Sequence, residues 1–269
     1  MNVMPEMNKV IVWGNNLPNT LGMIRSLGQK GVPVILMLEP TNRSRCYVRF
    51  SKYIKKIHYL KSLEDGLNVL RTHYWNETDK PILFCGGDPS VCLVDMHYDE
   101  LRDRFCVFNA EGQGRINHYM EKIHTFPLAE QCGFTRIRTW TVVGGDPIPE
   151  DVPFPCLAKG GNSVKSTKAD MRICKTVAEL QSHMRKGVGY LVQEFVQKEF
   201  ELNIIGLSYQ HGQKVFLPAA VRKIRDDLHR QSVFIRLDSI TDYAESILVS
   251  VEKLVKLIGY EGIFSVELI

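Results

Sequence analysis

The chain has 269 residues, of which 44% are hydrophobic and 24% are charged, and its formal net charge is +4. This composition is ordinary for a globular protein, and the length predicts two or three lobes rather than one small core. The weak positive charge permits an anionic ligand, but the sequence lacks the basic stripe with aromatic residues that favours nucleic-acid binding. We therefore expect small-molecule partners and no nucleic acid.

The seven cysteines are odd in number and have no CxxC spacing, and most lie within apolar runs. This usage indicates free thiols in a reducing compartment and disfavours a zinc site. No window approaches the roughly 18 apolar residues that a membrane span requires. Residues 1–9 lack the apolar region of a signal peptide. We expect a cytoplasmic protein with no membrane partner.

The first third of the chain alternates apolar runs with helical patterns. Strands are predicted at residues 9–14, 32–38, 57–59, 81–85 and 105–108, and helices at 19–30 and 63–74. This order predicts an α/β fold that begins with a doubly wound, Rossmann-like domain at residues 1–112. Gly14 ends the first run without the GxGxxG spacing, so we interpret it as a tight turn rather than a dinucleotide-binding loop.

The pattern changes at about residue 113, and strands dominate thereafter. Strands are predicted at residues 139–143, 156–159, 190–195, 201–206, 214–217 and 232–236, and helices at 117–132, 176–186 and 241–258. The final apolar stretch, residues 262–269, is typical of a strand and carries a single carboxylate, Glu267. We predict an α+β region with a small lobe at residues 113–196 and a large lobe at 197–269.

Lys159 is the first candidate binding residue. It ends an apolar strand and precedes a polar loop that contains Gly160, Gly161 and Ser163. Glycines let backbone N–H groups approach a polyphosphate closely, and a lysine supplies a compact positive charge. Taken alone, the segment is explained equally well by a hairpin with a flexible turn and a surface lysine.

Further candidates follow the next apolar strand, where the sequence turns polar. Gln193 and Glu194 have the position from which a side chain could read an adenine amino group. Glu199 and Glu201 share one strand face by their spacing, and a carboxylate there could accept ribose hydroxyls. A half-exposed strand pair with outward charges is the alternative. Lys122 lies on a predicted helix, where a lone lysine is expected to face solvent.

The order of these residues after a doubly wound domain resembles the ATP-grasp superfamily. It is most similar to the carboxylate–amine ligase branch, near D-aspartate ligases and carbamoyl-phosphate-synthase-like proteins. The resemblance covers almost the whole chain, and its specificity lies in the ordered set, since no single motif is as sharp as a Walker loop. The strand ending at Gly14 and the segments 83–88 and 222–225 also fit that branch.

The resemblance implies an ATP-dependent ligase that forms an amide through an acyl phosphate and releases ADP and phosphate, with ATP and Mg²⁺ as cofactors. It implies the following roles: Lys122 and Lys159 on the phosphates, Gly160, Gly161 and Ser163 in the covering loop, and Gln193, Glu194 and Phe195 at adenine. For the remaining groups it implies Glu201, or alternatively Glu199, at ribose, Glu267 as a Mg²⁺ ligand, and Arg222, Lys223 or Arg225 at the transferred phosphate or the substrate carboxylate.

The superfamily follows its first metal carboxylate with a strand that carries Glu-x-Asn and completes the metal site. The sequence given has no residue after Ile269. We therefore expect it to be truncated before the end of the ATP-grasp domain and inactive alone. The implied partners are a carboxylate and an amine, one of them an amino acid, and a second copy in a homodimer. The alternative function is a non-catalytic nucleotide-binding module that lacks its second metal carboxylate.

Overall fold

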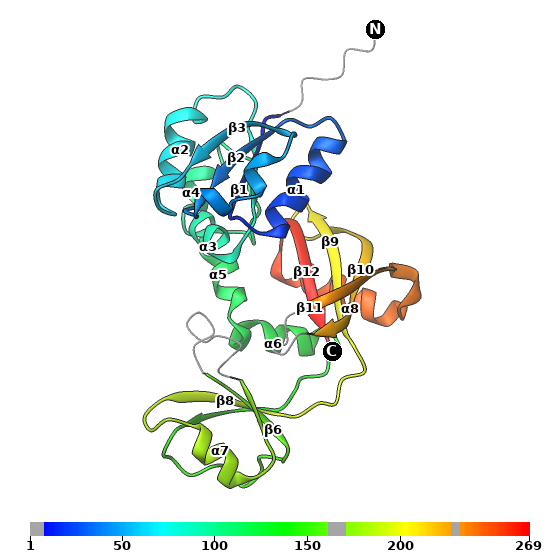
Figure 1. Cartoon of the computed structure of the whole chain (residues 1–269). Coiled ribbons are helices and arrows are strands. Elements are labelled where there is room, and N and C mark those ends of the chain that lie inside the picture. Colours follow the sequence, from blue (N-terminus) through cyan, green and yellow to red (C-terminus); the bar gives the residue numbers. More distant parts are fainter. Residues whose placement is uncertain (1–7, 161–170, 227–231) are drawn as a thin grey trace. The chain divides into compact units, whose positions relative to one another are not determined.

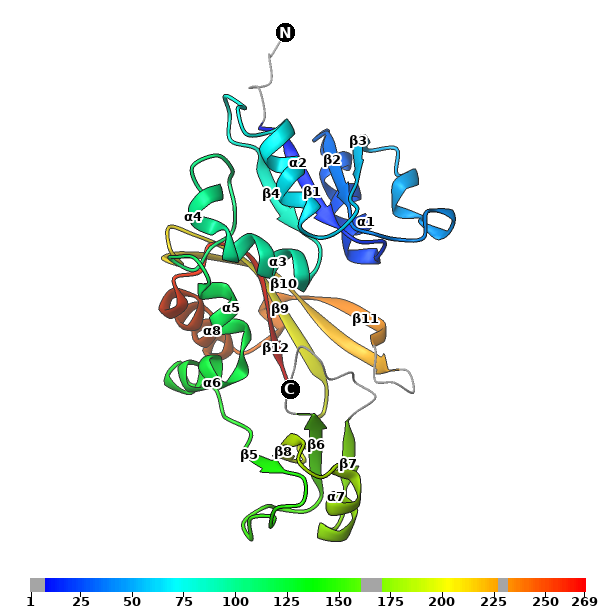
Figure 2. The same ribbon diagram turned by 90° about the vertical axis from the view of Figure 1, so that its left-hand side faces the viewer.

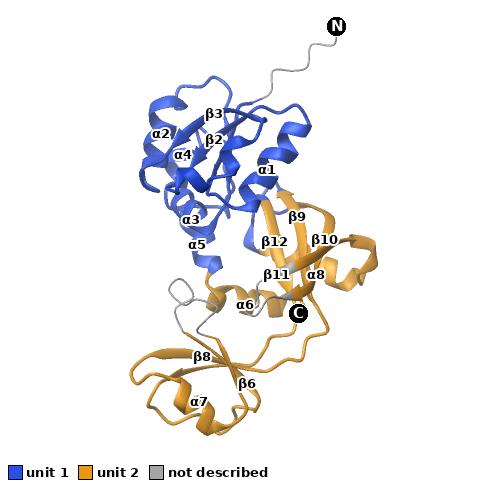
Figure 3. Cartoon of the chain, in the orientation of Figure 1, with its two compact units in different colours: residues 1–120, 209–213, 258–262 blue, residues 121–208, 214–257, 263–269 orange. Residues whose placement is uncertain are grey.

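The computed structural model describes residues 8–160, 171–226 and 232–269. The chain divides into two compact units (Figure 3). Unit 1 comprises residues 1–120, 209–213 and 258–262, and unit 2 comprises residues 121–208, 214–257 and 263–269. The predicted α/β class is confirmed, since one parallel sheet is followed by antiparallel pairings. The division at residues 112 and 196 stays a prediction.

Unit 1 is built on a four-stranded parallel sheet in the order β3-β2-β1-β4 (Figure 1 and Figure 2). The strands are β1 (Val10–Gly14), β2 (Val34–Leu38), β3 (Ile54–Tyr59) and β4 (Ile82–Cys85). β1 pairs in parallel with both β2 and β4, and every residue of β1 is buried. Burial on both faces explains why these strands read as continuous apolar runs.

Helices cover both faces of this sheet, as the predicted doubly wound pattern requires. α1 (Pro18–Gln29) packs Ile24 against β1 and β2 on one face. α2 (Asp65–His73) packs Leu67 and Leu70 on the other, together with α3 (Asp88–Met96) and α4 (Tyr98–Leu101). Successive strand residues point to opposite faces, so both cores draw on the same strands.

The strand predicted at residues 105–108 is wrong. Among the described residues, Cys106 forms only an isolated parallel bridge to Ile82, without a ladder. Phe105 is fully buried in the core beside α2. The apolar run therefore reflects core packing by a connecting segment, which a pattern of hydrophobicity alone does not distinguish from a short strand.

A hydrogen-bonded cluster joins three distant segments within unit 1. Asn109 and Glu261 exchange two backbone hydrogen bonds, of 3.0 and 2.8 Å. The Asn109 side chain donates to Glu261 Oε2 at 2.9 Å, and the His211 backbone N–H donates to Glu261 Oε1 at 3.0 Å. This cluster explains how residues 209–213 and 258–262 belong to the unit that holds the N-terminal sheet.

Unit 2 contains two four-stranded sheets, and the strands of the first are paired antiparallel. The first has the order β5-β8-β6-β7 and is formed by β5 (Thr139–Val143), β8 (Gly189–Glu194), β6 (Cys156–Gly160) and β7 (Arg172–Cys174). α7 (Val177–His183) covers one face of it through the buried Leu180 (Figure 2). β7, a three-residue edge strand, is too short to leave a clear sequence pattern.

The second sheet has the order β11-β10-β9-β12. Its strands are β9 (Glu201–Tyr209), β10 (Lys214–Asp226), β11 (Ser232–Ser239) and β12 (Gly262–Leu268), and α8 (Glu245–Ile258) precedes β12. β10 is far longer than the predicted strand at 214–217. The predicted helix at 117–132 is also wrong as one element, because Glu121 is extended between α5 (Arg115–Met120) and α6 (Lys122–Gln131).

All seven cysteines are free thiols, as expected. No helix in the described part of the chain is long and apolar enough to cross a membrane.

Candidate functional site

Lys159 is a lysine of unit 2 whose pKa is strongly shifted from its ordinary value. It lies near the end of β6, where its backbone pairs with Leu191 of β8. Burial, followed by repulsion from Lys122, lowers the pKa of Lys159 to about 8, and attraction to Glu267 only partly opposes this. Three residues that are far apart in the sequence therefore act on one another here. An anion placed among them would relieve the repulsion between the lysines.

Lys122 is the first residue of α6, directly after a break between two helices. Glu121 has an extended backbone (φ −80°, ψ 120°), and α6 restarts at Lys122 without a side-chain cap. The first turn of a helix carries a partial positive charge, so a lysine there is unfavourable unless an anion accompanies it. An anion beside Lys122 would therefore be favourable for both the lysine and the end of the helix.

Glu267 lies on the exposed face of the second sheet. Residues of β12 alternate between exposed and half-buried, and Glu267 is on the exposed side with Ile263 and Ser265. A Cβ atom placed on Gly206 of β9 would come within 2.2 Å of the Phe264 ring, so these two residues share the other face. By alternation, the odd-numbered residues of β9, which include Glu201, share the face of Glu267.

Glu201 is the centre of a second charged cluster on that face. Its two carboxylate oxygens accept hydrogen bonds from Lys198 and Lys223. The Lys223 and Glu201 side chains are only 12% and 18% exposed. Burial opposes ionisation, but the two ammonium groups hold the pKa of Glu201 below its ordinary value. Of the three basic candidates on β10, Lys223 is the one that shares this face.

Arg222 points to the opposite face, as neighbouring strand residues must. Its guanidinium lies 4.0 Å from the centre of the Phe200 ring. It is directly paired with Arg236 of β11, whose guanidinium donates to Asp238 at 2.5 and 3.1 Å. The Tyr243 hydroxyl also donates to Asp238, at 2.6 Å. Arg222 is therefore separated by the sheet from Lys223 and Glu267.

Arg225 does not follow the simple alternation. The register between β10 and β11 shifts after Lys223, so that Arg225 pairs with Phe234. Phe234 and Arg236 are two residues apart on β11 and share a face, which places Arg225 on the side of Arg222. Sequence reasoning missed Arg236 and the buried Asp238, although their alternation on one strand could have indicated a paired charge.

The proposed adenine residues lie at the end of β8, and their side chains already have partners. Gln193 is buried and donates to Thr139 Oγ1 at 2.9 Å. Glu194 accepts from the Arg138 backbone N–H at 3.1 Å and from its guanidinium at 2.8 Å. These bonds lower the pKa of Glu194. The Phe195 side chain is 39% exposed. Arg138 was not predicted as part of this segment.

The two ribose candidates differ in their surroundings. Glu199 is exposed and precedes β9, whereas Glu201 is the first residue of that strand and is half-buried. Gly160 is the last residue of β6. Gly161 and Ser163 lie outside the described residues. Within the described ranges, no group of three or more His, Cys, Asp or Glu side chains could hold a metal ion.

No family model matches the sequence, and no curated protein matches it at a significant level. Solved structures do match. The L-amino acid ligase from Bacillus licheniformis is 15% identical with a TM-score of 0.67, and the match covers 97% of this chain and 63% of that one. An ADP complex of N5-carboxyaminoimidazole ribonucleotide synthetase is 11% identical with a TM-score of 0.65, over 98% of this chain and 67% of that one.

A third similar structure is the biotin carboxylase domain dimer of Hydrogenobacter thermophilus 2-oxoglutarate carboxylase, in complex with MgADP and bicarbonate. It is 14% identical with a TM-score of 0.68, and the match covers 97% of this chain and 61% of that one. The chain has the ATP-grasp fold of these enzymes, and the predicted resemblance in fold is confirmed. It spans less than two thirds of the length of the first and third of them.

Proposed function

We propose that the chain is part of an ATP-dependent carboxylate–amine ligase. ATP phosphorylates a carboxylate, an amine attacks the resulting acyl phosphate, and an amide forms with release of ADP and phosphate. The similar structures with ADP or MgADP in their descriptions support the nucleotide and the metal. The L-amino acid ligase supports an amino acid as one substrate. A homodimer is part of the proposal, since the third similar structure is a dimer.

The observation that carries this proposal is the unbalanced cluster of Lys122, Lys159 and Glu267. Its two ammonium groups outnumber the single carboxylate, and burial adds to the cost of holding the charge on Lys159. A nucleotide polyphosphate supplies the missing negative charge. Glu267 fits a Mg²⁺ ligand, because this ion prefers carboxylate oxygens and usually takes one or two of them with phosphate oxygens and water.

The proposal assigns a role in the reaction to each residue of the cluster and to the residues that bind the nucleoside. Lys122 and Lys159 bind the phosphates and neutralise the charge that spreads over the transferred group. Glu267 would hold Mg²⁺, which supplies Lewis-acid stabilisation of the phosphate oxygens when bound. Glu201, kept ionised by Lys198 and Lys223, is the preferred ribose acceptor over Glu199. The backbone after Glu194 is the proposed adenine contact.

Arg222, Lys223 and Arg225 have divided roles in the proposal. Lys223 shares the sheet face of Glu201 and is assigned to the nucleotide side. Arg222 and Arg225, which lie on the other face by register, are assigned to an anionic group that approaches from that side, such as the substrate carboxylate. This division follows from strand alternation, which makes one site for all three residues unfavourable.

A second candidate function is nucleotide binding without turnover. It is favoured by one observation: among the described residues, Glu267 is the single carboxylate that acts on Lys159, whereas Mg²⁺ can take two. Thermal-shift measurements with ATP and Mg²⁺, and with NAD as the comparison, test both candidates. Stabilisation by MgATP alone supports nucleotide binding. Release of ADP that depends on an added amino acid, measured with the whole protein to which the chain is proposed to belong, then selects the ligase, and its absence across the amino acids selects the binding module.

A further inference from the structure

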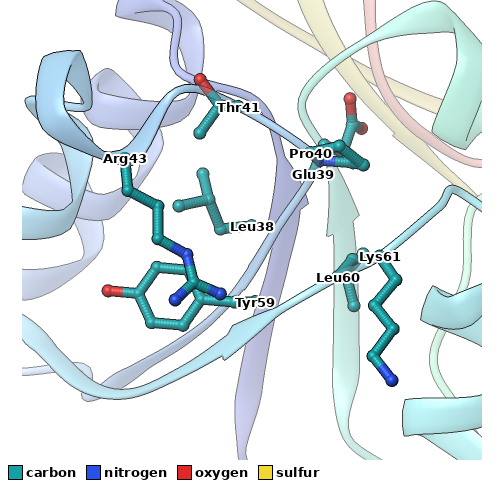
Figure 4. Close-up of a pocket in the computed structure, with 8 residues that line it drawn as sticks. All are labelled: Leu38, Glu39, Pro40, Thr41, Arg43, Tyr59, Leu60 and Lys61. Carbon is teal, nitrogen blue, oxygen red and sulfur yellow. The ribbon is translucent and has the colours of Figure 1, made fainter.

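A cavity of roughly 370 Å³ lies in unit 1, at the carboxyl ends of β2 and β3 (Figure 4). Leu38 and Tyr59 are the last residues of these strands, and the connections that follow them line the rest of the cavity. Ligands of open α/β sheets bind outside the carboxyl ends of the strands. The volume falls within the about 300–1,000 Å³ that is usual for small-molecule sites.

Two cationic side chains line this cavity. The Arg43 guanidinium lies over the Tyr59 ring, 4.2 Å from its centre, which holds the side chain flat and leaves its edge donors available (Figure 4). Neither Arg43 nor Lys61 forms an ion pair with any residue in the described ranges. The backbone at Lys61 is fixed, because its N–H donates to Asp65 Oδ2 at 2.9 Å.

Glu39 also lines this cavity, but its carboxylate is directed away from Arg43 and Lys61 (Figure 4). Glu39 follows β2 directly and is anchored by a 2.9 Å backbone hydrogen bond to Gly14. Its Oε1 atom is buried and has no hydrogen-bond partner in the described part of the chain. Burial raises the pKa of Glu39, against a hydrogen bond with Ser90. A buried oxygen has no surface that a ligand can reach, so we treat Glu39 as part of the cavity wall and not as a ligand contact.

We propose that this cavity binds a small organic anion. Arg43, stacked on Tyr59, binds the carboxylate or phosphate group with its planar fork, and Lys61 adds a second positive charge. Two cations and one carboxylate leave the lining with an excess positive charge, which matches an anionic ligand. All of these residues belong to unit 1, so the site does not depend on the proposed nucleotide site.

Isothermal titration calorimetry with two probes tests the proposal and separates the two sources of the anion. Ribose 5-phosphate represents a hydroxylated phosphate, and L-glutamate represents an amino acid. Both are titrated into the whole chain carrying Lys159→Ala, so that binding at the proposed nucleotide site does not contribute. Binding of either probe is expected, with at least a tenfold loss of affinity on adding Arg43→Ala.

Arg45→Ala is the matched control, because Arg45 lies in the same short helix, Arg43–Arg45, and does not line the cavity. Unchanged affinity in this control, together with the loss in Arg43→Ala, supports the site, and the probe that binds identifies the class of ligand. The proposal is overturned if neither probe binds at millimolar concentration, or if Arg43→Ala and Arg45→Ala have equal effects. Circular dichroism of each variant confirms that unit 1 remains folded.

Discussion

Unit 2 contains two clusters with the same composition, two lysines and one glutamate, in opposite electrostatic states. In the first, Glu201 accepts hydrogen bonds from both Lys198 and Lys223, and its pKa falls. In the second, burial and Lys122 act against Glu267 and lower the pKa of Lys159. In the first cluster, residues of the protein itself balance the carboxylate charge. In the second, the charge of the two lysines is balanced only when an anion is bound. The difference therefore separates a carboxylate whose charge the protein already balances from a pair of lysines that depend on a bound anion.

The largest expected effect is on nucleotide affinity. Lys159→Ala removes one of the two ammonium groups of the second cluster, and we expect MgATP affinity to fall about 100-fold, since hydrogen bonds to charged groups contribute about 1.5–3 kcal/mol. Calorimetric titration measures this change. Lys175→Ala, at an exposed lysine between β7 and α7, is the control. Equal MgATP affinity in wild type and Lys159→Ala would contradict the assignment of the cluster.

The first cluster is tested by Glu201→Ala. This change removes the carboxylate that accepts a hydrogen bond from the half-buried Lys223 ammonium, so we expect the free energy of unfolding to fall by about 2 kcal/mol. Urea denaturation provides the measurement. Glu199→Ala, at an exposed glutamate with no such role in the fold, is expected to leave stability unchanged. If both variants lost the same stability, the difference between the two clusters would disappear.

The effect of pH on nucleotide binding follows from the Lys159 pKa of about 8. The protonated lysine binds phosphate, so affinity is present below about pH 8 and is expected to fall about tenfold between roughly pH 7 and 9. A titration series across this range gives the profile. In Lys159→Arg the charge persists because an arginine does not deprotonate, and the pH dependence should vanish. If nucleotide affinity fell as steeply with pH in Lys159→Arg as in wild type, the pH dependence would belong to another titrating group.

The smallest effect is on stability. The unfolded chain holds the Lys159 proton up to about pH 10.4, whereas the folded chain releases it near 8, so folding is penalised at neutral pH and the penalty fades as pH rises. Lys159→Met is therefore expected to stabilise the protein by on the order of 1 kcal/mol at neutral pH, after allowing for solvent screening. Chemical denaturation at two pH values measures this. A destabilised Lys159→Met variant would show that Lys159 supports the fold.

The sequence predicted the fold well where apolar periodicity was strong. The buried strands of unit 1 and the long amphipathic α8 were found with small errors in their ends. Errors arose where packing overrode the pattern. Phe105 is part of an apolar run because it packs in the core, not because it lies in a strand. The helix break at Glu121 is not marked by a glycine or a preceding proline, so the sequence pattern did not predict it.

Only the family resemblance placed Lys122, Lys159 and Glu267 in one predicted site. Spacing along the chain does not show that they interact, because they come from α6, β6 and β12. The division between Arg222 and Lys223 was missed for a different reason. Strand alternation separates them, but the predicted strand ended at residue 217, before the residues whose faces mattered.

The pKa of Lys159 in the presence and absence of nucleotide is the most direct test of the central claim. Proton-detected NMR of the isotope-labelled lysine side chains, assigned with Lys159→Arg, follows the titration of its ammonium group. The account predicts a pKa near 8 in the ligand-free protein and a clear rise when MgADP is bound, because phosphate favours the charged form. A Lys159 pKa that stays the same with and without saturating MgADP would contradict it.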